Sequence, residues 1–305
     1  MDNGVRGVGI SVEAGPPDLS AIAAKLDAVQ ALGVDTIELP TYDWDLIVGG
    51  RIRKEALAKL KAACAGRGVT YTVHGPLAIN FLDEPFRLPR HFEVLQASIE
   101  VAAELGAIHY VAHSGLMPMT QQPGIEDAYR RQREWLTRAG HVAEAHGLYL
   151  CVENLFGVYE GKVHSATPAK LAAELTATGH SHVAATLDFS HAHLNLGFAG
   201  GALVEEVAAL APLAKHLHLH DSFGRQDDVW MYTEAERVAY GHGDLHLPVG
   251  WGDIPWNAIM ERCIFPQGVV FNIELHPRFM SVAKECVEAT RALAAKARTA
   301  ANPAG

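Results

Sequence analysis

Short apolar or β-branched runs alternate with longer, alanine-rich amphipathic segments along the chain, and the alternation repeats about eight times. Parallel strands joined by crossover helices produce this pattern, because each strand must be followed by a crossover before the next parallel strand can begin. With 305 residues and no linker-like change in composition, the pattern predicts an α/β fold, a single-domain (β/α)₈ barrel. An open doubly wound sheet is the alternative. We expect strands at 8–12, 35–39, 69–74, 107–113, 148–153, 183–188, 215–220 and 269–274.

Helices are expected between these strands. They are predicted over about 18–32, 53–66, 89–105, 125–146, 168–178 and 201–211, with a short helix from Pro255 and a last one over 280–297. The longest stretch without predicted structure is 221–253, and loops of that length in a compact domain are usually functional. We expect the barrel domain to span 1–300 and residues 301–305 to form a frayed tail.

The composition limits the classes of partner and compartment. The formal net charge is −10 and the pI is near 5.9, so bulk charge gives no attraction for a nucleic-acid backbone. The sequence shows no secretory leader and no long apolar run, which favours a cytoplasmic protein without a membrane segment. Widely spaced cysteines without a CxxC pair favour free, buried thiols in a reducing compartment. These cysteines are Cys64, Cys151, Cys263 and Cys286.

A glycine-rich segment at 241–253 contains Asp244 and His246, a carboxylate and an imidazole two positions apart. Because the segment is predicted to be a loop, neither residue is explained as the buried face of a helix or strand. Such a pair can bind a metal ion from one side. The pair becomes more informative beside the residues that end the predicted strands.

Metal-binding residue types stand at or near the carboxyl ends of six predicted strands. They are His74, His113, Glu153, Asp188, His218 and Glu274, and His191 follows three residues after Asp188. In a barrel these strand ends converge on the face that carries the active site. Converging carboxylates repel one another unless cations neutralise them, so the pattern predicts a metal site. Imidazole and carboxylate ligands without thiolate suit Zn²⁺, Mn²⁺, Fe²⁺ or Co²⁺ better than Ca²⁺.

These motifs resemble those of the xylose isomerase-like TIM barrels, a superfamily that includes sugar phosphate isomerases and epimerases, ketose 3-epimerases and endonuclease IV (AP endonuclease family 2). The resemblance extends over residues 8–276 and rests on short motifs around the strand ends. These motifs occupy 74–80, 113–115, 152–154, 187–191, 218–222, 244–252 and 273–275. In order and spacing they are similar to the nine-ligand metal set of endonuclease IV.

The resemblance to endonuclease IV implies up to three divalent metal ions per chain, with Zn²⁺ as the first candidate. One ion would be held by His74, His113 and Glu153, a second by Glu153, Asp188, His218 and Glu274, and a third by His191, Asp244 and His246. Such a site supplies a hydroxide near neutral pH and stabilises a leaving oxygen, which is the chemistry of phosphoester hydrolysis.

Two departures from endonuclease IV make DNA an unexpected substrate. Leu77 and Ala78 replace an aromatic-aliphatic pair, and the acidic segment 40–45 lacks the DNA-contacting arginine of that family. A small sugar-like or phosphorylated substrate is expected instead, with Arg225 and Arg278 as anion contacts and His220 as a substrate contact or a partner of the metal ligands. A homo-oligomer is left open.

Three hypotheses follow from the sequence. The first is a multinuclear hydrolase that cleaves a phosphoester of a small substrate. The second is a single-metal sugar isomerase or epimerase, in which Glu153 and Glu274 are the catalytic pair that moves a proton on and off the carbon beside a carbonyl. In this second case four residues hold the metal, namely Glu153, Asp188, His218 and Glu274, and the other five contact sugar hydroxyls. The third is a barrel that binds a metal or sugar without turnover.

Overall fold

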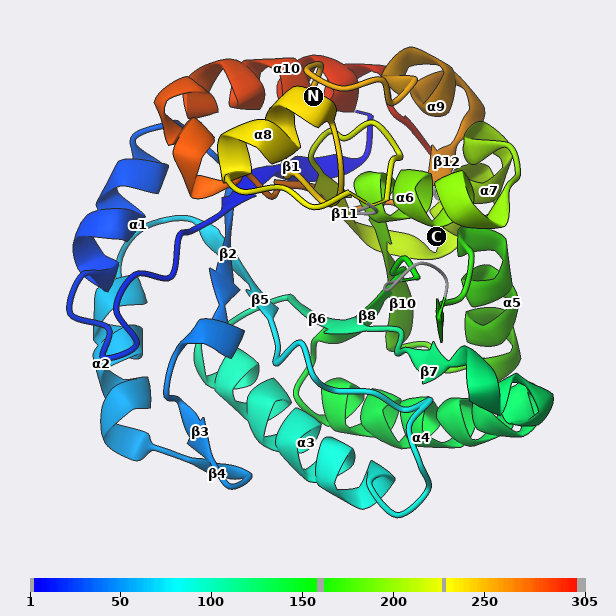
Figure 1. The fold of residues 1–305 in the computed structure, drawn as a ribbon. Helices are drawn as coiled ribbons and strands as arrows, with labels where there is room; N and C mark the ends of the chain where they lie inside the picture. Colours follow the sequence, from blue (N-terminus) through cyan, green and yellow to red (C-terminus); the bar gives the residue numbers. More distant parts are fainter. Residues whose placement is uncertain (1–2, 158–161, 227–228, 301–305) are drawn as a thin grey trace.

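The computed structural model describes residues 3–157, 162–226 and 229–300, and in these residues eight parallel strands close into a barrel (Figure 1). The strands are β1 (Val5–Ser11), β2 (Thr36–Pro40), β5 (Thr70–His74), β6 (His109–His113), β8 (Tyr149–Glu153), β10 (Val183–Asp188), β11 (Ala214–Leu219) and β13 (Val269–Ile273). Each pairs with the barrel strands before and after it, and β1 closes the ring against β13. The predicted single-domain (β/α)₈ barrel is confirmed, and the open sheet is excluded.

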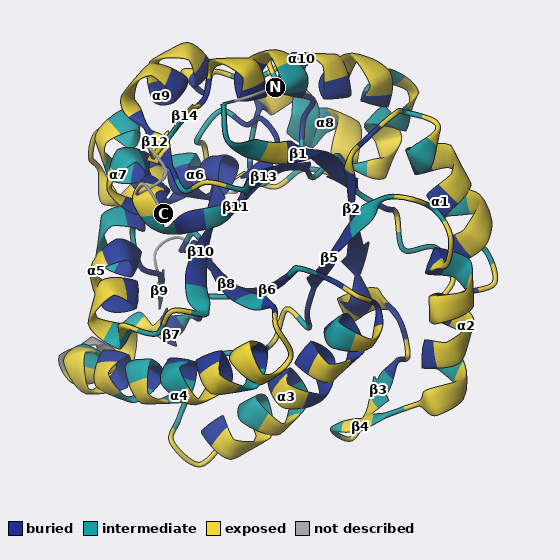
Figure 2. Ribbon diagram, turned by 180° about the vertical axis from the view of Figure 1, so that it is seen from behind, coloured by how far each residue is buried: buried dark blue, intermediate teal, exposed yellow. Residues whose placement is uncertain are grey.

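Helices surround the barrel, and most of them turn a buried side toward the strands, whereas α8 has no buried residue (Figure 2). They are α1 (Ile22–Gln30), α2 (Lys54–Cys64), α3 (Leu88–Glu104), α4 (Ile125–Ala145), α5 (Pro168–Thr178), α6 (Phe189–Ala199), α7 (Leu203–Leu210), α8 (Glu234–Tyr240), α9 (Trp256–Arg262) and α10 (Ala283–Lys296). In α3 the buried Leu88, Leu95, Ile99 and Ala102 recur at helical spacing, which gives the helix one face to bury.

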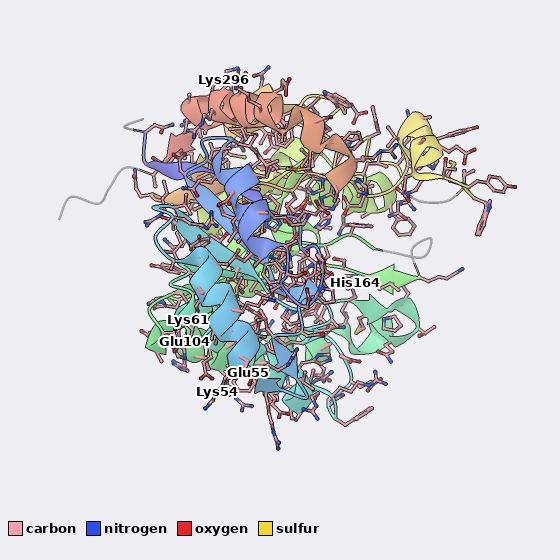
Figure 3. All side chains as sticks on the ribbon, turned by 90° about the vertical axis from the view of Figure 1, so that its left-hand side faces the viewer. Lys54, Glu55, Lys61, Glu104, His164 and Lys296 are labelled. Atoms are coloured by element: carbon pink, nitrogen blue, oxygen red, sulfur yellow. The ribbon has the colours of Figure 1, made fainter. Side chains whose placement is uncertain are left out.

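Charged side chains cover the outward faces of the helices. Figure 3 shows Lys54, Glu55 and Lys61 on α2, with Glu104 of α3 beside Lys61. Lys61 and Glu104 form an ion pair between the two helices. Both side chains are about half exposed, so the pair contributes little to stability.

The structure corrects two predictions about the second half of the chain. Residues 221–253 are not structureless, because α8 lies within them and begins with a capping box between Thr233 and Glu236. The connection after β10 holds two helices, α6 and α7, where one over 201–211 was predicted. Helix α6 begins directly at the strand end, because the Asp188 carboxylate accepts the backbone N–H of His191 at 2.7 Å.

Small two-stranded elements in the loops were also not predicted from the sequence. They are β3 (Ile47–Val48) with β4 (Arg51–Ile52), β7 (Met117–Pro118) with β9 (Val163–His164), and β12 (Ile264–Phe265) with β14 (Arg298–Thr299). Short 3₁₀ helices supplement them, including η1 (Thr41–Asp43) and η4 (Pro277–Val282). The predicted tail at 301–305 lies outside the described residues.

The interior of the barrel is more polar than the layer between strands and helices. A small apolar cluster of Val111, Cys151 and Ala184 lies apart from the main core. Polar side chains from β2, β5, β11 and β13 are also fully buried inside the described structure, namely Glu38, Thr72, His216, His218 and Asn272. Such groups are expensive to bury without partners, so their contacts carry information about function.

The four cysteines are free and buried, as the sequence predicted. Among the described residues, none of the helices combines the length and apolar character that crossing a bilayer would require.

Candidate metal centre and active site

The metal-binding residue types at the strand ends lie together at one end of the barrel. The Glu153 carboxylate, at the end of β8, is at the centre of the group. Its Oε2 lies 3.2 Å from Nε2 of His74 and 3.7 Å from Nε2 of His113. Its Oε1 lies 3.1 Å from Nδ1 of His191 and 3.2 Å from Nδ1 of His218. Three parallel strands and the first turn of α6 therefore bring four imidazoles to one buried carboxylate.

His218 joins Glu153 to two further carboxylates. Its Nδ1 lies 3.4 Å from Oε2 of Glu274 and 3.8 Å from Oδ2 of Asp188. Glu153, Asp188 and His218 are almost completely buried, and Glu274 keeps 12% of its side-chain surface exposed. The four positions expected for a single metal thus surround one nitrogen atom of His218.

The loop after α8 adds Asp244 and His246 to the group. The Asp244 Oδ2 lies 3.2 Å from Nε2 of His191 and 3.0 Å from Nε2 of His246. All nine residues that the sequence assigned to a metal set are therefore brought to one end of the barrel. Their roles as metal ligands stay a prediction, because proximity alone does not assign a metal.

Asp221, just after β11, fixes the path of this loop. Its buried carboxylate accepts the backbone N–H of Gly250 at 2.8 Å, the indole N–H of Trp256 at 2.9 Å and the backbone N–H of Ile254 at 3.3 Å. A Cβ on Gly252 would lie 2.3 Å from the carbonyl oxygen of Ser222, so only glycine fits there. The glycine-rich composition of the loop is thus explained by close packing on Asp221 and its neighbours.

His246 has a backbone conformation that side-chain-bearing residues rarely adopt, with a φ of 45°. Its ring stacks on the ring of His220 with centroids 3.9 Å apart and planes within 7°. Its Nδ1 also lies 3.1 Å from the carbonyl oxygen of Glu274. Strained backbone of this kind is typical of functional sites, where the surrounding contacts hold it in place.

His220 and the two arginines predicted as substrate contacts lie in different places. His220 is fully buried, with Nε2 2.9 Å from Oδ2 of Asp188, so it contacts a predicted ligand. Arg225 is exposed and donates to the carbonyl oxygen of Tyr240. Arg278 is exposed and stacks on Phe279. The role of the arginines in anion binding stays a prediction, to which the structure adds no contact.

The buried charges shift one another's protonation. Burial alone would raise the pKa of Glu153, but the neighbouring His218 and His191 hold it well below its usual range. Burial would lower the pKa of His218, but Glu274, Glu153 and Glu38 raise it well above its usual range. Burial dominates at His113 and lowers its pKa to about 4. These neighbours therefore favour the ionised form of Glu153, which is the state that binds a cation.

The donor set fits a divalent metal ion. Glu153 with His74 and His113, and His218 with His74 and Glu274, are groups whose donor atoms all lie within 4.8 Å of one another. Buried carboxylates this close together are unfavourable unless positive charge neutralises them. Imidazole and carboxylate donors are those that transition metals and zinc prefer in proteins.

A cavity of about 270 Å³ opens beside the centre, and Glu274 and His246 form part of its wall. The remaining wall comes from the loops after β1, β2 and β13. It consists of Ser11, Val12, Glu13, Ala14, Pro40, Tyr42, Asp43, Leu275, His276, Pro277 and Met280. Within the described part of the chain no lysine or arginine lines this cavity. Its volume suits a molecule the size of a small sugar.

Sequence reasoning missed three groups beside the centre. Tyr42 packs edge-on against His74, with ring centroids 5.2 Å apart, and lines the cavity. Glu38 and His216 lie just below His218 inside the barrel. A charged residue between Ile37 and Leu39 in a strand was the available signal for Glu38, because alternation places it on the barrel interior. His216 stands two positions before His218 on the same strand, so the same alternation places it on the barrel interior.

Comparison with known proteins places the chain in a family. The model of the family described as xylose isomerase-like TIM barrel matches residues 26–276, most of the chain. The match and the composition of the centre together indicate an enzyme. No curated protein matches the chain by sequence.

Solved structures with the same fold include several sugar epimerases. A D-tagatose 3-epimerase-like protein is 19% identical, with a TM-score of 0.70 over 95% of this chain and 98% of that chain. D-psicose 3-epimerase from Clostridium cellulolyticum H10, solved with D-tagatose, is 17% identical, with a TM-score of 0.66 over 94% and 99%. The TTHB071 protein from Thermus thermophilus, in a structure obtained by soaking with ZnCl₂, is 21% identical, with a TM-score of 0.64 over 96% and 99%. At these identities the likeness shows a shared fold.

Proposed function

The chain belongs to the xylose isomerase-like TIM barrel family, and we propose that it is a metal-dependent epimerase or isomerase of a small, unphosphorylated sugar. The observation that carries this proposal is the arrangement of Glu153, Asp188, His218 and Glu274 beside a sugar-sized cavity. This arrangement combines a place for one metal with two carboxylates for proton transfer. The names of several structural neighbours, which are sugar 3-epimerases, support the same choice.

Glu153 and Glu274 are the proposed acid-base pair. Glu153 ends β8 and Glu274 directly follows β13, and β10 and β11 separate these strands in the barrel, so the two carboxylates can approach a substrate from different sides. One carboxylate would take a proton from the carbon beside a carbonyl group, and the other would return a proton to the opposite face. A divalent metal held by the four residues would polarise the neighbouring substrate oxygen. His74, His113, His191, Asp244 and His246 would then contact hydroxyl groups of the sugar.

The charge of the cavity supports an uncharged substrate. Glu13 and Asp43 line the cavity, and among the described residues of its wall there is no cationic lysine or arginine. A phosphate group placed there would meet carboxylates rather than the guanidinium or ammonium groups that usually bind it. Hydroxyl groups, in contrast, can donate hydrogen bonds to these carboxylates.

Multinuclear phosphoester hydrolysis is the second candidate function. It is favoured by one observation, namely that His191, Asp244 and His246 lie close enough to hold a further ion. The absence of a lysine or arginine from the described cavity wall speaks against it. The two functions differ in metal number and in the chemistry of turnover, so both can be measured.

Metal content and turnover test the proposal together. The protein, purified without chelator, and an Asp244→Ala/His246→Ala variant are compared by elemental analysis after loading with Mn²⁺ or Zn²⁺. The proposal expects about one metal per chain in both proteins, because the four ligands that hold it are unchanged. Two or three ions in the wild type, falling by about one in the variant, would favour the hydrolase.

Turnover is measured with free ketoses, their phosphate esters and simple phosphodiesters. For a free ketose in deuterated water, the proposal expects epimerisation with deuterium incorporated at the inverted carbon, because the proton returned comes from a carboxyl group that exchanges with solvent. Hydrolysis of phosphoesters, with no deuterium incorporated into ketoses, would refute the proposal.

A further inference from the structure

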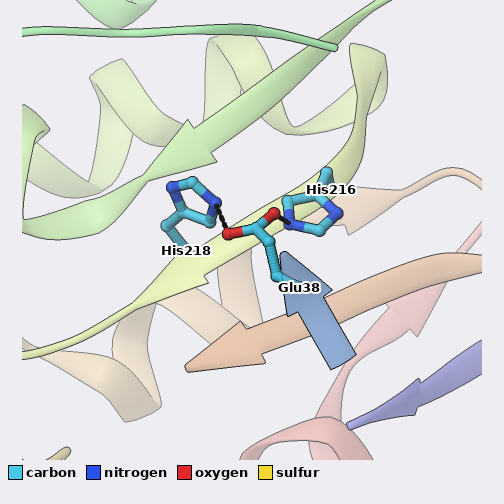
Figure 4. A group of neighbouring side chains, drawn as sticks. All are labelled: Glu38, His216 and His218. Atoms are coloured by element: carbon cyan, nitrogen blue, oxygen red, sulfur yellow. Dashed lines mark ion pairs between the residues drawn. The ribbon is translucent and has the colours of Figure 1, made fainter. Parts of the chain in front are cut away.

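A carboxylate inside the barrel, that of Glu38 on β2, lies between His216 and His218 of β11 (Figure 4). It is fully buried. Its Oε1 lies 3.2 Å from Nε2 of His218, and its Oε2 lies 3.0 Å from Nε2 of His216. No described lysine or arginine pairs with it, and these two histidines are its ionisable partners. A buried carboxylate kept in this position without a full cation calls for a functional explanation.

Neutral donors surround the rest of the Glu38 carboxylate. Ser11 donates its hydroxyl to Oε1 at 2.9 Å, and Asn272 donates its amide to the same oxygen at 3.1 Å. Thr72 donates to Oε2 at 3.4 Å. The carboxylate is therefore fixed by donors from three other barrel strands, β1, β5 and β13. Its position does not depend on the loops that form the cavity.

His218 turns a different ring nitrogen to each side. Its Nδ1 faces Glu153, Glu274 and Asp188, and its Nε2 faces Glu38. A ring that binds a metal through one nitrogen must carry its proton on the other, and a carboxylate is a common acceptor for that proton. In His218, Nδ1 is therefore placed to bind a metal and Nε2 is placed to donate its proton to Glu38.

We propose that Glu38 is a positioning residue for the metal centre, which holds His218 with Nε2–H toward β2 and with a bare Nδ1 toward the metal. The proposal rests on the metal site of the proposed function and adds a residue that lies outside it. Glu38 would contact neither substrate nor metal and would act only through His218. It would fix both the tautomer and the orientation of the one imidazole among the four ligands.

The contacts on the other side of Glu38 are consistent with this assignment. If His216 also turns an Nε2–H to Glu38, its Nδ1 is an acceptor. Nδ1 of His109 lies 3.3 Å from that Nδ1 and can donate to it. In its neutral form, each of these two rings has one N–H to donate and one nitrogen to accept. One set of tautomers therefore satisfies the whole chain from His109 to His218.

Replacing Glu38 with Gln tests the charge and the acceptor without changing the shape. An amide has one acceptor and one donor end, so it cannot accept from both His218 and His216. Affinities for Mn²⁺ and Zn²⁺ are measured by competition with a chelator on metal-free protein. We expect metal binding about 10–100-fold weaker in Glu38→Gln, as for other residues that support a metal-bound histidine. The absorption spectrum of the Co²⁺-loaded protein is expected to change as well, because the ligand field of His218 changes.

A matched control separates positioning from general disruption of the barrel interior. Thr72→Val alters a buried contact of the same carboxylate but leaves Oε1 facing His218. We expect its metal affinity and Co²⁺ spectrum to match the wild type. Thermal unfolding of each metal-free variant shows how much the fold itself is changed. Equal metal affinities for wild type and Glu38→Gln would overturn the inference, as would an equal loss of affinity in both variants.

A crystal structure of the Mn²⁺-loaded wild type gives a second test that does not require any variant to fold. Metal bound to Nδ1 of His218, with Nε2 within hydrogen-bond distance of Glu38, would support the inference. Metal bound to Nε2 would overturn it, because Glu38 would then face a ligand atom rather than an N–H. Failure of the wild type to bind any metal would refute the proposed function itself, and this outcome is distinct from an unaffected Glu38→Gln variant.

Discussion

The candidate site has two halves that are built in different ways. Glu153 and His218 stand on barrel strands and are at most 1% exposed. Asp244 and His246 stand on a loop, and their side chains are 20% and 29% exposed. The strand half is held by the geometry of the barrel and by Glu38 behind it. The loop half depends on Asp221 and on a strained backbone. The rigid strand half suits metal binding and proton transfer, and the loop half suits the selection of the substrate.

The largest effect is expected in the strand half, from replacing Glu274, the less buried member of the proposed acid-base pair. Glu274→Gln keeps the shape of the side chain but cannot accept a proton, so we expect kcat to fall by about 10²–10⁴-fold. Deuterium exchange into the substrate should fall with it. The measurement is a steady-state assay with metal at saturating concentration. His276→Gln, which changes a cavity residue outside the proposed pair, serves as the control and should affect KM more than kcat.

A smaller effect, on stability and substrate binding, is expected when the contacts that hold the loop half are weakened. In the wild type, buried N–H groups donate to both carboxylate oxygens of Asp221. In Asp221→Asn one of these oxygens becomes an NH₂ group, which cannot accept. Each buried donor left without an acceptor lowers the free energy of unfolding by about 1–3 kcal/mol. We expect a lower midpoint of thermal unfolding and weaker substrate binding. Metal content should stay at the wild-type value, because no strand ligand contacts Asp221. Loss of the metal together with the loop would show that the two halves are not separable.

The same division explains what could be predicted from the sequence. The eight strands and the convergence of their end residues follow from periodicity and from the rule that parallel strand ends meet at one face. Loop-borne contacts do not follow such a rule. The positions of Arg225 and Arg278 depend on the conformations of irregular segments, and the sequence pattern does not predict these conformations. The helix at 234–240 was missed because its seven residues are too few to show a reliable period.

Glu38 shows the opposite case, in which the information was present in the sequence. An acidic residue between Ile37 and Leu39 must point away from the helices and into the barrel, since alternate residues face opposite sides of a strand. Its partners could not be predicted, because β2 and β11 lie on different sides of β1 and β13. Which interior residues meet across a barrel depends on the strand register, and this requires the structure.

The response of stability to pH tests the buried chain of histidines below the strand half. Burial, supported by His216, lowers the pKa of His109 well below its usual value. The unfolded chain therefore takes up a proton near pH 6.5 that the folded chain refuses, and stability is lost as pH falls below that value. We expect His109→Gln to be less stable than the wild type at pH 8, because the contact to His216 changes. The difference in unfolding free energy between the two proteins should become smaller from pH 7 to pH 5, because only the wild type has the His109 contribution to lose. Denaturant unfolding curves across this range measure this difference. A stability difference that does not change with pH would show that the pKa of His109 is not lowered by folding.

The smallest effect is expected from the strained residue of the loop half. A side chain at a φ of 45° costs about 1 kcal/mol relative to glycine, which adopts this region without a penalty. We therefore expect His246→Gly to be more stable than His246→Ala by about this amount in denaturant unfolding, although both lose the ring that stacks on His220. Both variants should retain the metal of the strand half and bind substrate more weakly. Equal stabilities would mean that the loop relaxes once the ring is removed, and the strain would then be a consequence of the contacts of His246 with His220 and Glu274 rather than a property of the loop path.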